Sequence, residues 1–270
     1  SRHFFGMGTK EANEWYQRNR MIHNIQFHHN MSNLFNPEVF AGHPEYYADD
    51  VVPTHAYSWQ PYFNDVTAEA AIQRIIKYFD DNPNASSYSL GINDGTNYAE
   101  KSGHPDYPTE YNSVGRLHRT DYYARWVNKV AEGVTAVYPD KYFGLLAYRE
   151  MFDPPKNEDG TPYKLHQNVI PYITDDRMAW MDPKIEEAGK SNTEAWAECA
   201  ENLGFYEYMY GASYNMPRIY LDQMAENYQY GDEYGVIGHV AELYPNWGEG
   251  PNPWLSAKLQ WNPNRNVDDL

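Results

Sequence analysis

Apolar positions along the chain follow two alternating patterns, one with helical spacing and one of short continuous runs. Between residues 68 and 79, apolar side chains recur at helical spacing, and Thr67 just before them predicts the helix N-terminus. Residues 88–92 then form a short apolar run, which is typical of a strand that is covered on both faces. A second helix, capped by Ser113, and a second strand over residues 142–148 repeat this order.

The same alternation continues to the end of the chain. Further helices are expected around residues 192–202, from Pro217, and near 253–259, and further strands over 168–173, 204–209 and 235–241. Residues 24–29 could form an earlier strand, while residues 30–61 and 151–165 are expected to be long loops.

Helices that alternate with buried strands indicate an α/β protein with a parallel sheet, either an open doubly wound sheet or a closed barrel. Neither GxGxxG nor GxxxxGK[ST] occurs, so the phosphate-binding loop typical of the open sheet is missing. We therefore expect a TIM (β/α)8-type barrel, with residues 1–270 forming a single partial domain that lacks the first strands.

Composition narrows the classes of partner. The formal net charge of -17, from 21 basic and 38 acidic residues, excludes a bulk nucleic-acid binder and disfavours an anionic membrane surface. No apolar run approaches the roughly 20 residues that a membrane span needs, so membrane insertion is not expected. The aromatic fraction of 16% is typical of proteins that stack sugar rings, although aromatic side chains also fill cores.

Polar side chains follow several of the predicted strands. In a barrel enzyme the site is built from the carboxyl ends of the strands and the loops after them. We therefore select as candidate substrate-binding residues those that stand near these ends or on the early histidine segment: Tyr148, Arg149, Asp175, Arg177, Trp247, His28 and His29.

Three acidic residues are candidates for catalysis. Glu242 directly follows the last strand, where burial would raise its pKa as a general acid requires, although it could equally pair with an arginine for structure. Asp94 follows the strand at 88–92, but an Asp-Gly pair is also a common turn. Glu207 lies within the strand at 204–209 and is expected to point towards the barrel mouth.

Other chemistries lack their signatures. The histidines meet no zinc-ligand spacing, so no metal is expected, and no cofactor is indicated. The chain has no GxSxG motif, and its single cysteine, Cys199, is predicted to lie on a helix that faces no evident base, which argues against a nucleophilic triad.

Three segments carry a resemblance to a known family. Residues 88–95 (YSLGINDG), 125–131 (RWVNKVA) with 138–142 (YPDKY), and 241–251 (AELYPNWGEGP) resemble the bacterial domain of unknown function 4838, and the resemblance covers most of the chain. That family is grouped with TIM-barrel glycoside hydrolases and is similar in organisation to the α-glucuronidases. The resemblance implies a secreted or periplasmic bacterial protein, with a smaller α/β domain before residue 1. Asp94 and Glu242 lie in the matching motifs.

We accordingly expect a glycosidase that acts on a plant or algal polysaccharide, one with acidic sugars being an option, through a pair of carboxyl groups. Glu242 would be the general acid, and Asp94 or Glu207 the base or nucleophile. Two alternatives stay open, a non-catalytic carbohydrate-binding protein on the same fold and a lyase that acts on uronic acids with a tyrosine or histidine base. The sequence does not indicate an oligomeric state.

Overall fold

The computed structural model describes residues 2–5, 9–21, 24–54, 59–209, 219–243 and 250–270. The chain divides into two compact units, which are described separately. Unit 1 contains Ser1–Asn24, Tyr172–Ala197 and Glu201–Leu270, and unit 2 contains Ile25–Pro171 and Glu198–Ala200. The division falls within one strand, β4 (Val169–Asp175).

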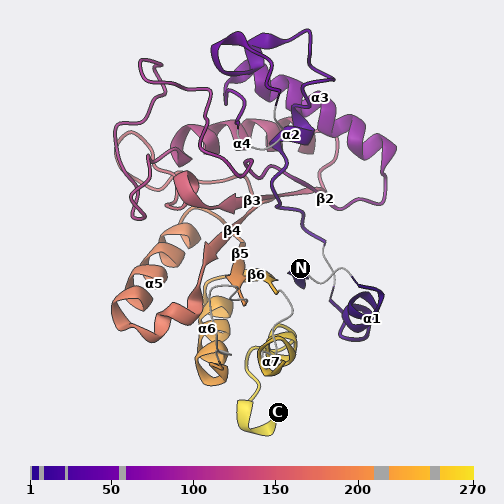
Figure 1. The fold of residues 1–270 in the computed structure, drawn as a ribbon, viewed down its shortest axis with the longest axis vertical. Helices are drawn as coiled ribbons and strands as arrows, with labels where there is room; N and C mark the ends of the chain where they lie inside the picture. The colour runs from indigo at the N-terminus through magenta and orange to yellow at the C-terminus, as the bar shows by residue number, and fades with distance from the viewer. Residues whose placement is uncertain (1, 6–8, 22–23, 55–58, 210–218, 244–249) are drawn as a thin grey trace. The chain divides into compact units, whose positions relative to one another are not determined.

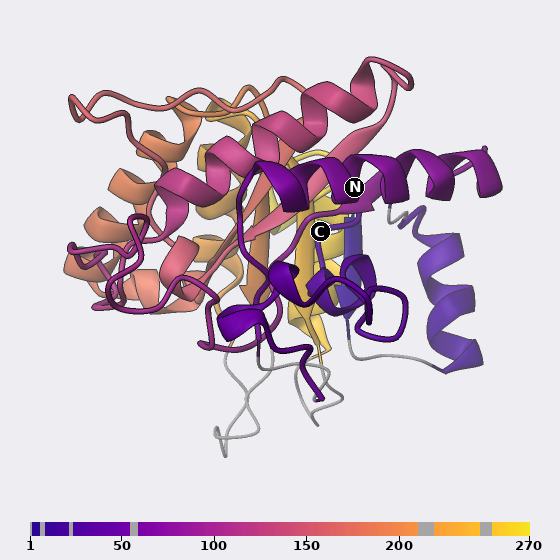
Figure 2. The ribbon, with the colours of Figure 1, turned by 90° about the horizontal axis from the view of Figure 1, so that it is seen from above.

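Unit 2 is built on two parallel strands, β2 (Ser87–Ser89) and β3 (Tyr142–Ala147), which pair from Ser87 with Tyr142 to Ser89 with Gly144. Helix α3 (Asp65–Asp81) precedes β2, and helix α4 (Thr120–Thr135) connects β2 to β3. Figures 1 and 2 both show α3 lying alongside α4. Both helices bury most of the apolar stripe that their spacing predicted, because that face packs inside the unit.

The loops of unit 2 contain short helical segments. Residues 30–61, expected to be one long loop, include α2 (Met31–Leu34) and the 3₁₀ turns η1 (Pro44–Tyr46) and η2 (Ala48–Asp50). A further 3₁₀ turn, η3 (Arg149–Met151), follows β3 closely and opens the second expected loop.

Unit 1 contains the parallel strand order β1-β6-β5-β4, formed by β1 (Arg2–Phe5), β6 (Val236–Glu242), β5 (Leu203–Tyr208) and the carboxyl end of β4. Its remaining elements are helices and turns: α1 (Lys10–Arg18), η4 (Arg177–Met181), α5 (Pro183–Ala197), α6 (Leu221–Glu233), α7 (Pro251–Leu259) and η5 (Val267–Asp269). Buried side chains of α1, α6 and α7 share one hydrophobic cluster.

In each unit a helix connects one parallel strand to the next, as β2–α4–β3 in unit 2 and β4–α5–β5–α6–β6 in unit 1. The expected α/β class is thereby confirmed, and the fold is consistent with a partial (β/α) barrel. Among the described residues, no helix is long and apolar enough to cross a membrane.

Several predicted boundaries are wrong. The first long helix begins at Asp65 rather than Thr67, because Asn64 caps it and Thr67 completes a reciprocal capping box. Ser113 caps no helix: its hydroxyl and backbone N–H donate to Asp153. Helix α4 begins only at Thr120.

Other differences concern position along the chain. Helix α5 occupies Pro183–Ala197 instead of residues 192–202, so Cys199 lies just beyond it, buried, with its thiol against the Pro155 carbonyl. Residues 24–29 form no regular strand and make only one bridge, from His29 to Gly91. Pro217 lies outside the described residues.

Candidate functional site

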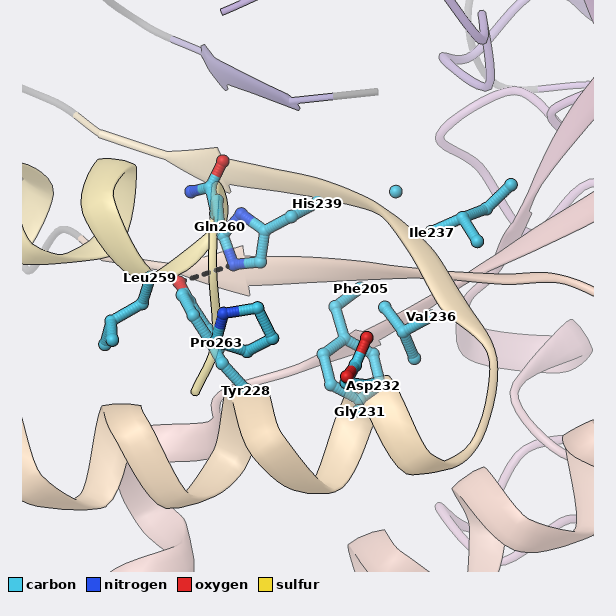
Figure 3. A pocket seen from close by; sticks show the side chains of 11 residues that line it. Phe205, Tyr228, Gly231, Asp232, Val236, Ile237, His239, Leu259, Gln260 and Pro263 are labelled. Carbon is cyan, nitrogen blue, oxygen red and sulfur yellow. Dashed lines mark hydrogen bonds between the residues drawn. The ribbon is translucent and has the colours of Figure 1, made fainter. Parts of the chain in front are cut away.

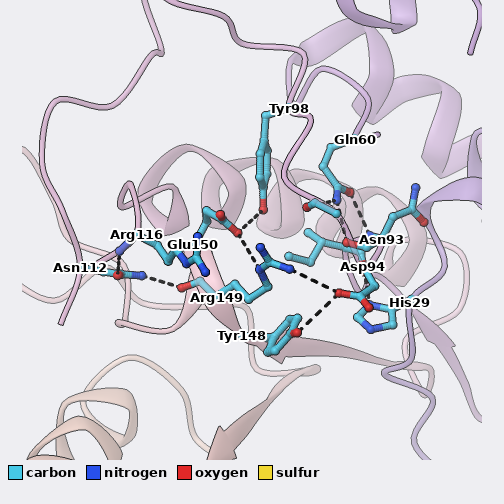
Figure 4. Close-up of polar contacts among 12 residues, drawn as sticks. His29, Gln60, Asn93, Asp94, Tyr98, Asn112, Arg116, Tyr148, Arg149 and Glu150 are labelled. Carbon is cyan, nitrogen blue, oxygen red and sulfur yellow. Dashed lines mark hydrogen bonds and ion pairs between the residues drawn. The ribbon is translucent and has the colours of Figure 1, made fainter. Parts of the chain in front are cut away.

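An exposed carboxylate, Asp94, lies in unit 2 against two side chains from the end of strand β3 (Figure 4). The Tyr148 hydroxyl donates a hydrogen bond to Asp94 Oδ1 over 3.5 Å, and Arg149 Nη1 lies 3.7 Å from the same oxygen. The Asp94 side chain is 55% exposed and the Arg149 side chain 26%. The cluster thus presents a carboxylate, a phenol and a guanidinium to solvent, groups that bind sugar hydroxyls or a sugar carboxylate.

The backbone of Arg149 is in the left-handed region, with φ of +53°. A non-glycine residue in this region costs about 1–3 kcal/mol and persists only where its surroundings hold it, as happens at many functional sites. The Asn112 side-chain amide donates to the Arg149 carbonyl over 2.6 Å, and the Arg119 N–H donates to the next carbonyl, that of Glu150, over 3.0 Å. These two bonds hold the strained turn that directs Arg149 towards Asp94.

The turn that carries Asp94 is anchored by Gln60. Its side-chain oxygen accepts from the Asn93 N–H over 2.9 Å, and its amide group donates to the Asn93 carbonyl over 2.8 Å (Figure 4). Asn93 in turn donates to the Trp59 carbonyl over 2.7 Å. Asp94 therefore exposes its side chain from a turn whose preceding residue, Asn93, is buried and held by two hydrogen bonds from Gln60.

Of the two adjacent histidines, one joins the cluster. The His29 ring lies 6.0 Å from the Tyr148 ring, and its Nδ1 is 2.6 Å from the Ile92 carbonyl oxygen. His28 is exposed, and its carbonyl accepts from the Ser89 hydroxyl. The structure brings together four predicted site residues in unit 2: His29, Asp94, Tyr148 and Arg149.

Glu150 lies behind Arg149 and was not among the predicted site residues. It is buried, with Oε2 3.8 Å from Arg149 Nε and 3.5 Å from the Tyr98 hydroxyl. The sequence did contain a signal for Glu150, because this residue directly follows the candidate Arg149 at the end of a predicted strand. Gln60 and Asn112, which hold Asp94 and Arg149 in place, are far from both in sequence, so nothing local indicated them.

In unit 1, Glu242 ends strand β6 and is half-buried. Its Oε1 accepts a hydrogen bond of 2.6 Å from the Tyr206 hydroxyl. The β5–β6 register pairs Tyr208 with Glu242, so Tyr206, Tyr208 and Glu242 share one face of the sheet. That face also carries the Tyr172 ring, which covers Gly204 and Gly238 so closely that neither position has room for a Cβ.

Glu207 points to the other face, which α6 covers, and the expectation that it points to the barrel mouth is therefore corrected. Phe205, two residues earlier on the same face, packs against Gly231 of α6. Arg177 Nη1 donates to Glu207 Oε1 over 2.8 Å, and the guanidinium lies 3.5 Å from the centre of the Phe205 ring. Both charged side chains are buried, so the pair belongs to the packing between strand and helix.

Two more of the predicted binding residues lie in unit 1, where each has a side-chain partner within the protein. Arg177 is the partner of Glu207, and Asp175 accepts a hydrogen bond of 2.9 Å from the Trp180 indole N–H. Asp175 pairs in register with Glu207, so it also faces the helices. Trp247 lies outside the described residues.

The Glu207–Arg177 pair makes stability depend on pH. Burial raises the pKa of Glu207 from 4.5 to about 7, although Arg177 opposes the rise. Between these values the folded protein holds a proton that the unfolded chain has released, so the part of the stability that comes from this bound proton is present below pH 4.5 and is lost as the pH rises through about 7. We expect the difference in unfolding free energy between wild type and Glu207→Gln to fall across this window. Urea unfolding measures it, and a constant difference would contradict the assignment.

A cavity of about 90 Å³ in unit 1 lies among β6, α6 and the segment after α7 (Figure 3). Its polar lining includes Tyr228, whose hydroxyl is 2.7 Å from His239 Nε2. Small-ligand sites span about 300–1,000 Å³, so this cavity is too small for a sugar ring. Among the described residues, no group of three or more His, Cys, Asp or Glu side chains is arranged to hold a metal ion.

A search of the curated proteins found no match to this chain. A sequence profile of the family described as Domain of unknown function (DUF4838) matches residues 2–270. This match spans almost the whole chain, and the protein therefore belongs to the DUF4838 family.

Proposed function

We propose that the protein is a carbohydrate-active enzyme of the glycoside hydrolase kind, which cleaves an oligo- or polysaccharide with a pair of carboxyl groups. The observation that carries the proposal is the exposed Asp94 held between Tyr148 and the strained Arg149. It follows a strand of a β/α unit, the position from which barrel enzymes build their sites. Placement among the TIM-barrel glycoside hydrolases and a secreted or periplasmic location belong to the same proposal.

Different roles are assigned to two carboxyl groups, one in each unit. Glu242 serves as general acid, because it stands at the carboxyl end of strand β6 and the Tyr206 hydroxyl orients one of its oxygens. Asp94 serves as base or nucleophile, because its carboxylate is exposed to a substrate and is positioned by Tyr148 and Arg149. Tyr148, Arg149 and His29 bind the sugar around Asp94, and the guanidinium suits a sugar that carries a carboxylate.

The raised pKa of the Tyr148 hydroxyl favours hydrolysis over a lyase reaction in which this tyrosine is the base. Burial and the neighbouring Asp94 raise the pKa of the Tyr148 hydroxyl, and Arg149 opposes this only in part. A tyrosine that removes a proton from a uronic acid must act as the phenolate, and a raised pKa leaves less phenolate at neutral pH.

Turnover of a panel of plant and algal glycans tests the proposal. We expect Glu242→Gln and Asp94→Asn each to lower turnover by about a hundred- to ten-thousandfold, because each removes a proton-transfer or nucleophilic group. Glu226→Gln, an exposed glutamate on α6, is the matched control and is expected to leave turnover unchanged.

Three other outcomes would each contradict a different part of the proposal. Full activity of Glu242→Gln would remove Glu242 from its role. A product that absorbs in the ultraviolet would indicate a lyase. Tight binding of a glycan without any product would indicate a non-catalytic binding protein.

A further inference from the structure

A groove of about 300 Å³ lies next to the turn that carries Asp94, within unit 2. Its volume is at the lower end of the range of small-ligand sites, about 300–1,000 Å³. The groove lies between the segment 47–54 and the bridge that pairs Trp59 with Asn97. None of its lining residues was a candidate from the sequence.

The groove and the Asp94 turn are one hydrogen-bonded structure. Gln60 lines the groove, its backbone N–H donates to the Asn97 carbonyl over 2.9 Å, and its side chain holds Asn93 from both sides. The same amide group also reaches the Gly95 carbonyl over 3.4 Å. A ligand in the groove would therefore be adjacent to a ligand held at Asp94.

The chemistry of the lining suits a neutral sugar. Two of the lining residues are buried aromatic side chains, Tyr47 and Trp59, which pack edge to face at 5.2 Å. Val51, 65% exposed, gives an apolar surface for the C–H face of a sugar ring. The polar lining includes the Asn97 carboxamide and the Lys101 ammonium, which contact each other.

The charges of the lining favour a neutral ligand over an anionic one. Asp49 and Lys101 contribute one charge of each sign. Asp49 and its neighbour Asp50 both have left-handed backbones, with φ of +57° and +54°. Strain of this kind is concentrated at ligand-binding segments, because only the surrounding structure maintains it.

We propose that this groove is a subsite that binds a neutral sugar residue next to the one held at Asp94. The inference rests on the proposed function, since it adds a second sugar position to that site. It defines the substrate class as an oligosaccharide chain with a neutral residue adjacent to the residue at the Asp94–Arg149 cluster.

Isothermal titration calorimetry with xylo-, cello- and manno-oligosaccharides of increasing length tests the subsite. The measurements use a Glu242→Gln background, so that cleavage does not consume the ligand. In at least one series, affinity is expected to rise with chain length. Asn97→Ala and Lys101→Ala should each weaken binding of the longer members about five- to tenfold, the effect of losing one hydrogen bond, and leave the shortest unchanged. Lys77→Ala, an exposed lysine on α3, is the matched control.

The proposal is overturned if no neutral oligosaccharide binds, if affinity does not rise with length, or if the groove variants weaken all lengths equally. Binding and turnover separate the two proposals. Length-dependent binding that the groove variants abolish, together with unchanged turnover in Asp94→Asn, would retain the subsite and reject Asp94 as a catalytic residue. Loss of turnover in Asp94→Asn, together with binding that does not depend on chain length, would retain Asp94 as a catalytic residue and reject the subsite.

Discussion

Replacing Glu207 by alanine is expected to destabilise the protein by about 3–5 kcal/mol at slightly alkaline pH, because the change leaves a buried charge without its partner. The Arg177 side chain is 1% exposed, and its Nη1 donates to Glu207 over 2.8 Å. A guanidinium does not lose its proton inside a protein, so Arg177 stays charged and the free-energy cost of burying an unpaired charge remains. Urea unfolding of the variant against wild type measures the loss.

A double variant separates the unpaired charge from the loss of packing. Arg177→Met combined with Glu207→Leu removes both charges and keeps much of the volume, and such exchanges are often neutral or stabilising. We expect the double variant to be more stable than Glu207→Ala. A loss of less than about 1 kcal/mol in Glu207→Ala, the size expected of an exposed pair, would show that water reaches this pair.

Replacing Arg149 by glycine is expected to relieve backbone strain and to lower activity. Glycine adopts the left-handed region without steric cost, so relief of the strain at φ of +53° should offset, by about 1 kcal/mol, the stability lost with the contacts of the guanidinium to Asp94 and Glu150. Loss of the guanidinium beside Asp94 removes a positioned donor, which should lower turnover about a hundredfold or more. Chemical unfolding and steady-state kinetics on a cleaved glycan measure the two effects.

Arg149→Ala is the matched control for the strain. Both variants lose the guanidinium and should be equally slow, but alanine keeps the Cβ that makes the left-handed backbone costly. The glycine variant should therefore be the more stable of the two by about 1 kcal/mol. Equal stability of the two variants would show that the turn at Arg149 is not strained, whatever their activity.

For the strands after residue 140, most predicted ends lie within about two residues of the observed ends. Residues 142–148, 204–209 and 235–241 were expected, and β3, β5 and β6 occupy Tyr142–Ala147, Leu203–Tyr208 and Val236–Glu242. Continuous apolar runs bounded by turn residues identify buried strands well. Helix starts were less predictable, because several polar residues near a helix start could each cap it, as Asn64 and Thr67 show.

The candidate site was predictable only in part. Tyr148 and Arg149 stand directly after β3 and Asp94 stands a short turn after β2, so their neighbourhood follows from the rule that parallel strands end at the same edge. Gln60 and Asn112 reach the site from loops, and their roles depend on contacts across 33 and 37 residues of sequence. The backbone conformation of Arg149 had no local signal either, because arginine rarely adopts it.

The sequence alone determined the β/α alternation, the buried stripes of α3 and α4, and the acidic residues near the strand ends. Only the tertiary structure decided which face of the sheet each acid occupies. In a parallel sheet that is covered on both faces, apolar residues point both ways, so the pattern does not distinguish the helix face from the interior. Packing against α6 directs Glu207 to Arg177, while Glu242 lies with Tyr206 on the opposite face. Hydrogen bonds from distant loops likewise decided that Arg149 points to Asp94.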